Sequence, residues 1–192
     1  MNIFYLHEIP AISVKRHCDK HVVKMVIEYA QLLSTAHRML DGTHWIDASS
    51  GRRIKRWRLD NYCMDSVLYK ASHINHPSAI WVRQNNSQYQ YMYNMFENLC
   101  EEYTYRYGKI HMTDSKLREL LVDSPKNIRI GSFQEPPQCM PYYCKQSNSV
   151  DGYRTYYREE KKGFAKWTNR EVPEFMNVAW FYLKKIQYML VN

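Results

Sequence analysis

The stretch CDKHVVKMVIEYAQLLSTAHRML, residues 18–40, decides the fold class, because its apolar residues recur at the spacing of an α-helix. The apolar positions are Val22, Val26, Leu33, Ala36 and Leu40. The sequence DGTH at 41–44 then supplies a stop signal. We therefore expect one long amphipathic helix over 18–40.

The other side of this helix carries His21 and Glu28. Residues seven apart lie two turns along one helix face, so these two side chains would be about 10 Å from each other. The same face continues roughly through Lys24, Gln31, Thr35 and Arg38. The ordinary interpretation is a solvated polar face, and a functional interpretation needs a partner for the histidine and the carboxylate.

The rest of the chain predicts further helices and no strand of any length. We expect helices at 59–72, 77–107 (divided near Asn85-Asn86-Ser87), 113–121, 149–162 and 174–190. The segment 48–60 reads as a basic loop insertion, and 124–148, with four of the seven prolines, as an ordered but irregular crossing. The expected fold is all-α: a single compact domain over 1–192, with about six helices and no regular bundle topology.

The charge balance points to a polyanionic partner. The chain has 27 Lys and Arg against 19 Asp and Glu, a formal charge of +8, and is rich in tyrosine. Nucleic acid is the first partner to consider and an anionic membrane surface the second. No stretch approaches the 18 or so apolar residues of a membrane-spanning helix, and no signal peptide is apparent. Five scattered cysteines indicate a reducing compartment, so we expect a soluble, cytoplasmic, monomeric protein.

The N-terminal sequence MNIFYL is apolar and aromatic from its third residue, so we expect the chain start to be tied into the core. An α-amine has an ordinary pKa of about 7.7–8.0 against about 10.4 for lysine. It is therefore the better nucleophile toward a sugar carbon without any tuning by its surroundings. Because Asn2 is bulky, we expect Met1 to be retained and to carry this amine.

Several short motifs resemble one family of enzymes. Asp19-x-His21 followed by Glu28, behind an N-terminal Met-x-Ile, resembles the start of the phage pyrimidine-dimer DNA glycosylases, also called the endonuclease V family. NHPSAIWV at 75–82 and YNMFENLCEEYTYRYGKIH at 93–111 are similar to later segments of that family, and YRTYYREEKKGFAKW at 153–167 is more loosely similar to its C-terminal segment. The resemblance depends on the order and spacing of these pieces.

The resemblance implies a DNA glycosylase with AP lyase activity on damaged or modified pyrimidines, pyrimidine dimers in particular, encoded by a virus. In that family the N-terminal α-amine attacks the sugar C1′ and forms a Schiff base, a glutamate stabilises the sugar cation and positions proton transfers, and β-elimination cuts the strand. The corresponding catalytic residues here are Met1, Glu28 and His21. No cofactor and no metal are expected.

The chain departs from the family at arginines that hold DNA. Ile27 and Gln31 stand where the family has arginines around the glutamate, and Asn2 replaces the arginine after the nucleophile. The sequence therefore supports the chemistry more strongly than the choice of lesion. We expect the basic insertion to contact phosphates, which positions DNA without reading its bases. The expected DNA-binding residues are Asn2, Lys24, Gln31, Arg52, Arg53, Lys55, Arg56, Arg58, His76, Arg154, Lys161, Lys162 and Lys166.

An enzyme that takes a nucleotide out of the stack needs aromatic or apolar surfaces to replace the lost stacking. Four aromatic residues beside basic ones are candidates: Trp57, Tyr156, Tyr157 and Trp167. Aromatic residues at helical spacing are more often part of a core, and EEKKGFAKW at 159–167 is equally well explained as a solvated end. His76 before Pro77 is likewise a candidate for a helix cap as well as for the site.

Two other functions stay open. A non-catalytic basic module that binds DNA or RNA would leave Glu28 as a surface carboxylate. A metal-dependent nuclease would use His17-Cys18-x-x-His21 with His73-x-x-His76, whose spacing suits zinc, although no CxxC pair accompanies them. The sequence contains no glycine-rich phosphate loop and no G-x-S-x-G motif, which argues against P-loop NTP hydrolysis and against an α/β-hydrolase.

Overall fold

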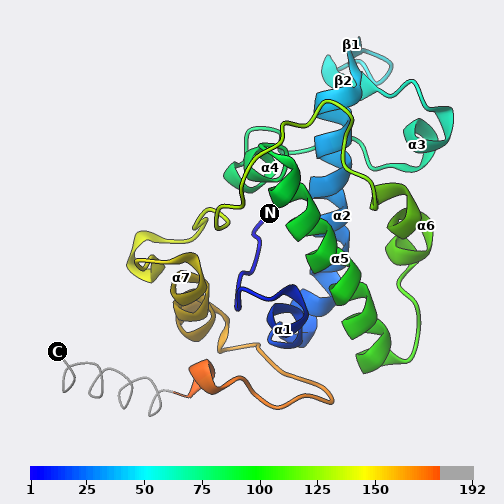
Figure 1. Ribbon diagram of the computed structural model, residues 1–192. Helices are drawn as coiled ribbons and strands as arrows, with labels where there is room; N and C mark the ends of the chain where they lie inside the picture. Colours follow the sequence, from blue (N-terminus) through cyan, green and yellow to red (C-terminus); the bar gives the residue numbers. More distant parts are fainter. Residues whose placement is uncertain (178–192) are drawn as a thin grey trace.

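The computed structural model describes residues 1–177 (Figure 1). The fold is mostly helical, and two helices form its centre: α2 (Asp19–Asp41) and α5 (Asn86–Tyr107), which pack along each other. The short helix α1 (Pro10–Lys15) packs against α5, α4 (Pro77–Val82) against α2 and α5, and α6 (Met112–Leu121) against both central helices. The buried apolar side chains form one continuous cluster.

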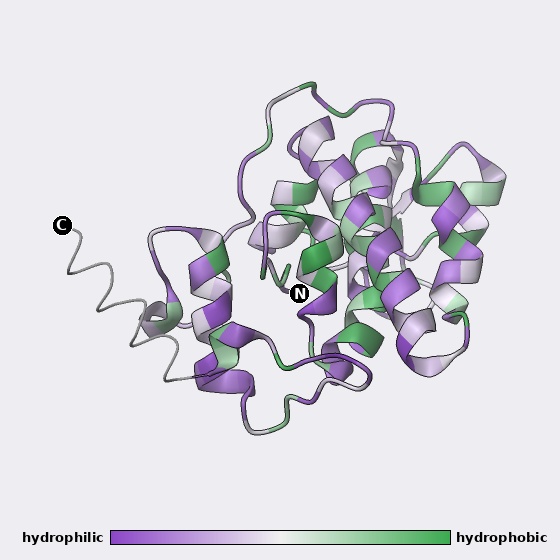
Figure 2. Ribbon diagram, turned by 60° about the horizontal axis from the view of Figure 1, so that its bottom comes forward, coloured by the Kyte–Doolittle hydropathy of each residue, from purple (hydrophilic) through white to green (hydrophobic). Residues whose placement is uncertain are grey.

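The long helix predicted over 18–40 is confirmed, but its second half is not amphipathic. From Tyr29 to Arg38 every residue except Gln31 is buried, because the N-terminal segment and three helices surround this part of α2. The solvated face expected to continue through Thr35 and Arg38 therefore ends near Gln31. In Figure 2 the hydrophobic residues gather where the N-terminal segment meets the central helices, and the outer turns are mostly hydrophilic.

The all-α prediction is wrong in one region. The basic insertion is not a loop but an antiparallel hairpin of β1 (Thr43–Asp47) and β2 (Ile54–Arg58), with Thr43 opposite Arg58 and Asp47 opposite Ile54. The strands contain β-branched and aromatic residues, which suit extended backbone. Asp47 Oδ1 accepts from the Ser49 amide at 3.0 Å and so starts the connecting turn.

Buried Arg38 fastens this hairpin to α2. Its guanidinium donates to the Trp57 carbonyl at 2.8 Å, to both the carboxylate and the carbonyl of Asp65, and to the carbonyls of Leu68 and Tyr69. The side chain is completely buried, and Asp65 provides the opposite charge at 2.7 Å. One residue of α2 thus holds the end of β2 and the segment around α3 (Tyr62–Val67).

The other helix predictions are largely confirmed, with shifted boundaries. The helix expected at 59–72 is reduced to α3, and the break near 85–87 exists because the Asn85 side chain accepts from the Gln88 amide and caps α5. The helix expected at 113–121 is α6, and the His111 ring caps it by accepting from the Thr113 amide. The helix α1 was not predicted.

The C-terminal part differs more from expectation. The helix expected at 149–162 is α7 (Ser149–Tyr156) continued by one π-helical turn, η2 (Tyr157–Lys161). The irregular crossing at 124–148 contains only a short 3₁₀ turn, η1 (Tyr142–Cys144), in agreement with its proline content. Of the helix expected at 174–190, only a 3₁₀ turn, η3 (Glu174–Met176), is described, and 178–190 lie outside the described residues. Within 1–177 no helix is both long and apolar enough to cross a membrane.

Candidate active site

The N-terminal arm, residues 1–6, is built into the core by polar contacts as well as apolar ones. Ile3 and Leu6 are completely buried, and Phe4 and Tyr5 nearly so. The Phe4 amide donates to the Tyr29 hydroxyl at 3.3 Å. Ser13 Oγ donates to the Phe4 carbonyl and accepts from the Leu6 amide. The anchored chain start expected from the sequence is therefore present, and Met1 is partly buried against the same core.

His17 forms a hydrogen bond with Tyr29, the residue that binds the arm at Phe4. Its Nδ1 donates to the Ser13 carbonyl at 2.9 Å, so its Nε2 accepts from the Tyr29 hydroxyl at 3.0 Å. Complete burial lowers the pKa of His17 to about 4, so the ring is neutral at physiological pH. A neutral His17 leaves the Tyr29 oxygen free to accept from the Phe4 amide.

His21 lies behind the arm. Only 6 % of it is exposed, its ring stacks on that of Phe4 at 4.1 Å, and its Nδ1 forms a hydrogen bond with the Tyr157 hydroxyl. Burial lowers the pKa of His21 to about 3, and electrostatic interactions with His17, Lys161 and Lys24 act in the same direction. Because His21 contacts the arm and not the space around the amine, its position fits a positioning residue and not a catalytic one.

Two groups of the predicted site, the Met1 α-amine and Glu28, interact electrostatically with His76. Burial lowers the pKa of His76 most, the positive charge of the Met1 α-amine lowers it further, and the carboxylate of Glu28 acts in the opposite direction. Electrostatic interactions therefore connect His76 both to the Met1 α-amine and to Glu28. Lys24 pairs with Glu28 at 3.0 Å, and the Glu28 side chain keeps 16 % of its surface exposed.

His76 both caps a helix and interacts with the Met1 α-amine and Glu28. Its Nδ1 accepts from the Ser78 amide at 3.2 Å, and Pro77 occupies the first turn of α4. In the neutral ring the proton is therefore on Nε2, which can donate to a bound group. The cap and the site role that the sequence left as alternatives are compatible.

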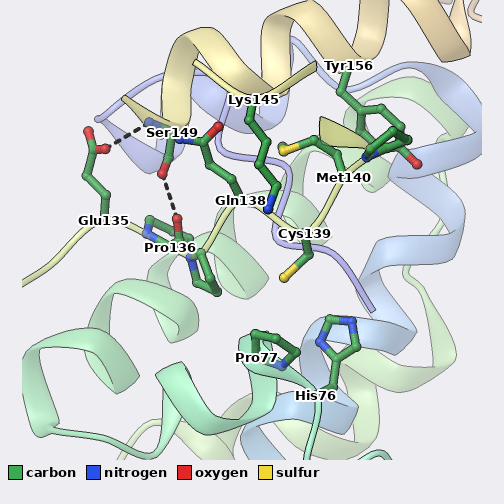
Figure 3. Close-up of a pocket in the computed structure, with 12 residues that line it drawn as sticks. His76, Pro77, Glu135, Pro136, Gln138, Cys139, Met140, Lys145, Ser149 and Tyr156 are labelled. Atoms are coloured by element: carbon green, nitrogen blue, oxygen red, sulfur yellow. Dashed lines mark hydrogen bonds between the residues drawn. The ribbon is translucent and has the colours of Figure 1, made fainter. Parts of the chain in front are cut away.

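A cleft of about 830 Å³ opens beside His76, and this volume lies in the range of sites for small organic groups. His76 and Pro77 form one wall, and Lys145, Ser149 and Tyr156 the other. Between them runs the proline-rich segment 135–141. In Figure 3 the Lys145 side chain reaches into the cleft from the wall opposite His76, and the sulfur of Cys139 points toward Pro77.

Of the two neighbouring tyrosines predicted to stack on bases, the structure makes only Tyr156 available. Its ring lines the cleft and stacks near Phe4 at 6.2 Å. Lys161 Nζ lies 4.2 Å above the ring and donates to its hydroxyl at 3.0 Å. Tyr157 is completely buried against His21, so its ring cannot be offered to a base.

Other predicted contacts lie away from the cleft. Arg52, Arg53 and Lys55 are exposed on the hairpin, which follows the far end of α2. Arg56 pairs with Asp47 at 3.5 Å, and Arg58 lies over the Trp45 ring. The Trp57 ring is half-buried and packs at 5.2 Å from that of His44. The hairpin and the cleft are therefore separate parts of the expected DNA surface.

The remaining candidates are divided between structural and exposed positions. Arg154 donates to the Leu6 carbonyl at 3.1 Å, so it holds the arm. Trp167 Nε1 donates to the Arg16 carbonyl at 3.0 Å and fixes the C-terminal segment on the end of α1. Asn2 and Gln31 are half-buried, whereas Lys162 and Lys166 are exposed.

Sequence reasoning missed the contribution of the irregular crossing. Lys145 lies in the cleft, and the 3₁₀ turn beside it displays Tyr142 with 88 % of its surface exposed and Tyr143 with 63 %. The available signal was the sequence PYYCK at 141–145, two aromatic residues followed by a cation directly after a rigid proline segment.

The histidine motifs do not assemble into a metal centre in the described part of the chain. His17 and His21 are buried and hydrogen-bonded to tyrosines, and His76 uses Nδ1 in its cap. Within residues 1–177 no group of three or more His, Cys, Asp or Glu side chains is placed to hold an ion. The donor arrangement therefore gives the metal-dependent alternative no support.

Comparisons with known proteins do not identify a family: no family description, no curated protein and no solved structure matches this chain. The function must therefore be argued from the site.

Proposed function

We propose that this chain is a DNA glycosylase with AP lyase activity, which excises damaged or modified pyrimidines through a Schiff base on the Met1 α-amine. The observation that carries the proposal is that His76, which lines the cleft, interacts electrostatically with both the Met1 amine and the Glu28 carboxylate. An α-amine held by a buried arm is a positioned nucleophile, and a carboxylate beside it is a general base.

The proposed reaction uses these groups in order. The neutral amine of Met1 attacks the sugar C1′ while the C1′–base bond breaks and its electron pair leaves with the base, which then takes up a proton. Glu28 stabilises the positive charge that develops on the sugar and accepts the proton lost by the amine. The sugar ring opens as O4′ is protonated, which gives the imine. Loss of a C2′ proton then expels the 3′ phosphate and cuts the strand.

The basic surface around the cleft supports DNA as the substrate. Lys24, Lys145 and Lys161 lie at or near the site, and Tyr156 offers a ring on which a base can stack. Lysines near a cleft attract phosphates independently of sequence, so these contacts position the strand.

Borohydride trapping on duplex DNA with one abasic site tests the proposal. We expect a covalent adduct with the native chain and none when the terminal amine is blocked or moved by added residues. The absence of an adduct at every pH between 6 and 9, with DNA binding retained, would favour the non-catalytic binding module. Activity abolished by EDTA would favour the metal-dependent nuclease.

Glu28→Gln sharpens the test. We expect DNA binding within a few-fold of the native value and excision reduced by at least about a hundredfold, as for the loss of one acid–base group. Glu119→Gln, an exposed glutamate on α6, is the matched control and should excise normally. Unchanged excision in Glu28→Gln would remove this carboxylate from the mechanism.

A further inference from the structure

The β1–β2 hairpin projects from the end of α2, away from α1 and α7 (Figure 1). Four of the five residues of β1 are exposed, and no residue of either strand is buried. A two-stranded ribbon that buries so little is not explained by packing.

The base of the ribbon is nevertheless fixed. Arg38 holds the Trp57 carbonyl from inside the core. At Gly42, the residue between α2 and β1, an added Cβ would lie 2.5 Å from the Arg38 carbonyl oxygen and 3.1 Å from the Trp57 Cβ. Only glycine fits this close approach, so the ribbon leaves α2 in one direction.

The ribbon carries a concentrated positive charge. Residues 43–58 contain five basic side chains and the single acid Asp47, a net charge of +4 out of +8 for the whole chain. Asp47 is already occupied by Ser49 and Arg56. Arg52 and Arg53 follow the turn at Gly51 and are exposed at the tip. The surface therefore matches a polyanion.

We propose that this ribbon enters the major groove of duplex DNA. The major groove, about 12 Å wide and 8.5 Å deep, admits a two-stranded β-ribbon, and five-residue strands give a ribbon about 17 Å long. Arg52 and Arg53 at the tip reach base edges, where arginine pairs with guanine O6 and N7. Lys55 and Arg58 lie nearer the base of the ribbon and contact phosphates. This changes the role expected from the sequence, which was phosphate contact alone.

The position of the ribbon gives its place on the duplex. From Glu28 to the end of α2 at Asp41 is about 20 Å along the helix axis. With α2 placed along the duplex axis, this length corresponds to about six base pairs at 3.4 Å per base pair. The choice of DNA rests on the proposed function, and we expect the ribbon to bind about half a helical turn to one side of the excised nucleotide.

Binding to an undamaged duplex tests the ribbon without any excision step. We expect the double variant Arg52→Ala/Arg53→Ala to weaken binding at least tenfold. The double variant Lys109→Ala/Lys116→Ala removes the same charge from exposed positions elsewhere and should weaken it less than threefold. Equal losses in the two variants would overturn the proposal, because they would mean that net charge alone matters.

Two further measurements identify the groove. Methylation of guanine N7, which projects into the major groove, should interfere with binding of the native chain about six base pairs from the lesion. The same methylation should not lower the DNA affinity of the Arg52→Ala/Arg53→Ala variant any further. Duplex RNA has a deep, narrow major groove, so the tip variant should bind it less than threefold more weakly than the native chain, as expected for the loss of two charges alone. Binding that is blocked by ligands of the minor groove but not by N7 methylation would overturn the proposal. A tip variant that loses as much affinity for duplex RNA as for duplex DNA would overturn it too.

The outcomes for enzyme and ribbon are separable. A borohydride adduct without tip-dependent binding overturns the ribbon and leaves the proposed function. Tip-dependent, N7-sensitive binding without an adduct supports the ribbon and overturns the enzyme.

Discussion

The N-terminal arm and the β1–β2 hairpin are attached to the same helix, α2, in opposite ways. The arm is buried and meets the polar side chains of Ser13 and Tyr29 along its length. The hairpin is exposed and depends on Arg38 at its base. If the Met1 amine is the nucleophile that we propose, it needs the first kind of attachment, whereas a ribbon that enters the major groove, as we propose for the hairpin, needs only a fixed base.

The largest expected effect comes from pH and acts on three buried histidines, of which His17 and His21 support the arm and His37 joins α2 to Tyr89 of α5. Burial lowers the pKa of His17 and His37 to about 4 and that of His21 to about 3, from 6.5. The unfolded chain therefore binds more protons below pH 6.5, so stability is fully present above that pH and is lost as the pH falls toward the folded pKa values. Because an unfolded histidine is only half protonated at pH 6.5, each group gives a loss of roughly 1.6 kcal/mol between pH 6.5 and 5, and the three together about 5 kcal/mol.

Urea unfolding at several pH values measures this loss. His37→Gln should reduce the slope by about a third, since one of three groups is removed. His44→Gln changes an exposed residue of the hairpin and should leave the slope as it is. A flat stability profile between pH 6.5 and 5 would contradict the account of the arm.

The next effect concerns the attachment of the hairpin. Arg38→Met should lower the free energy of unfolding by about 3–5 kcal/mol, because it leaves the Asp65 carboxylate and several buried carbonyls without their donor. Arg129→Ala, at an exposed position, should change it by less than about 0.5 kcal/mol. Chemical denaturation of both variants gives the comparison, and equal stabilities would show that Arg38 does not hold the fold.

A smaller effect separates position from stability in the arm. Tyr29→Phe removes the hydroxyl that joins His17 to the Phe4 amide and should cost about 1–3 kcal/mol. Because the arm is then no longer fixed by a hydrogen bond at Phe4, the rate of borohydride adduct formation should fall more than the affinity for DNA does. Tyr93→Phe, a mostly buried tyrosine on α5, is the control for the loss of a hydroxyl. Equal rates in both variants would argue against positioning by Tyr29.

The sequence could predict what depends on local pattern. The period of apolar residues identified α2 and α5, and Asn85 marked the boundary before α5. The hairpin was missed because its strands are short, highly charged and joined by a six-residue connection that lacks the usual two-residue turn sequences. Basic residues in such a segment are as typical of a loop as of an exposed ribbon.

The site was predictable only where neighbours in sequence are also neighbours in space. His21 and Glu28 both follow from the helix, yet the arm covers one and leaves the other accessible, and the folding back of Phe4 cannot be read from α2 itself. Lys145 is far from His76 in the chain, so only the course of the proline-rich segment brings both to the same cleft.

The smallest effect on stability belongs to Tyr142, which directly follows Pro141 of the cleft lining in sequence. Its side chain is almost fully exposed, so Tyr142→Ala should change the free energy of unfolding by less than about 0.5 kcal/mol. If the ring stacks on a base beside the extruded nucleotide, the variant should lose roughly 1–3 kcal/mol of affinity for a duplex that contains an abasic site. Tyr62→Ala on α3 removes an equally exposed ring, 86 % against 88 %, far from the cleft. Fluorescence anisotropy with the same duplex compares them, and a loss in Tyr142→Ala no larger than in Tyr62→Ala would leave Tyr156 as the stacking surface of the site.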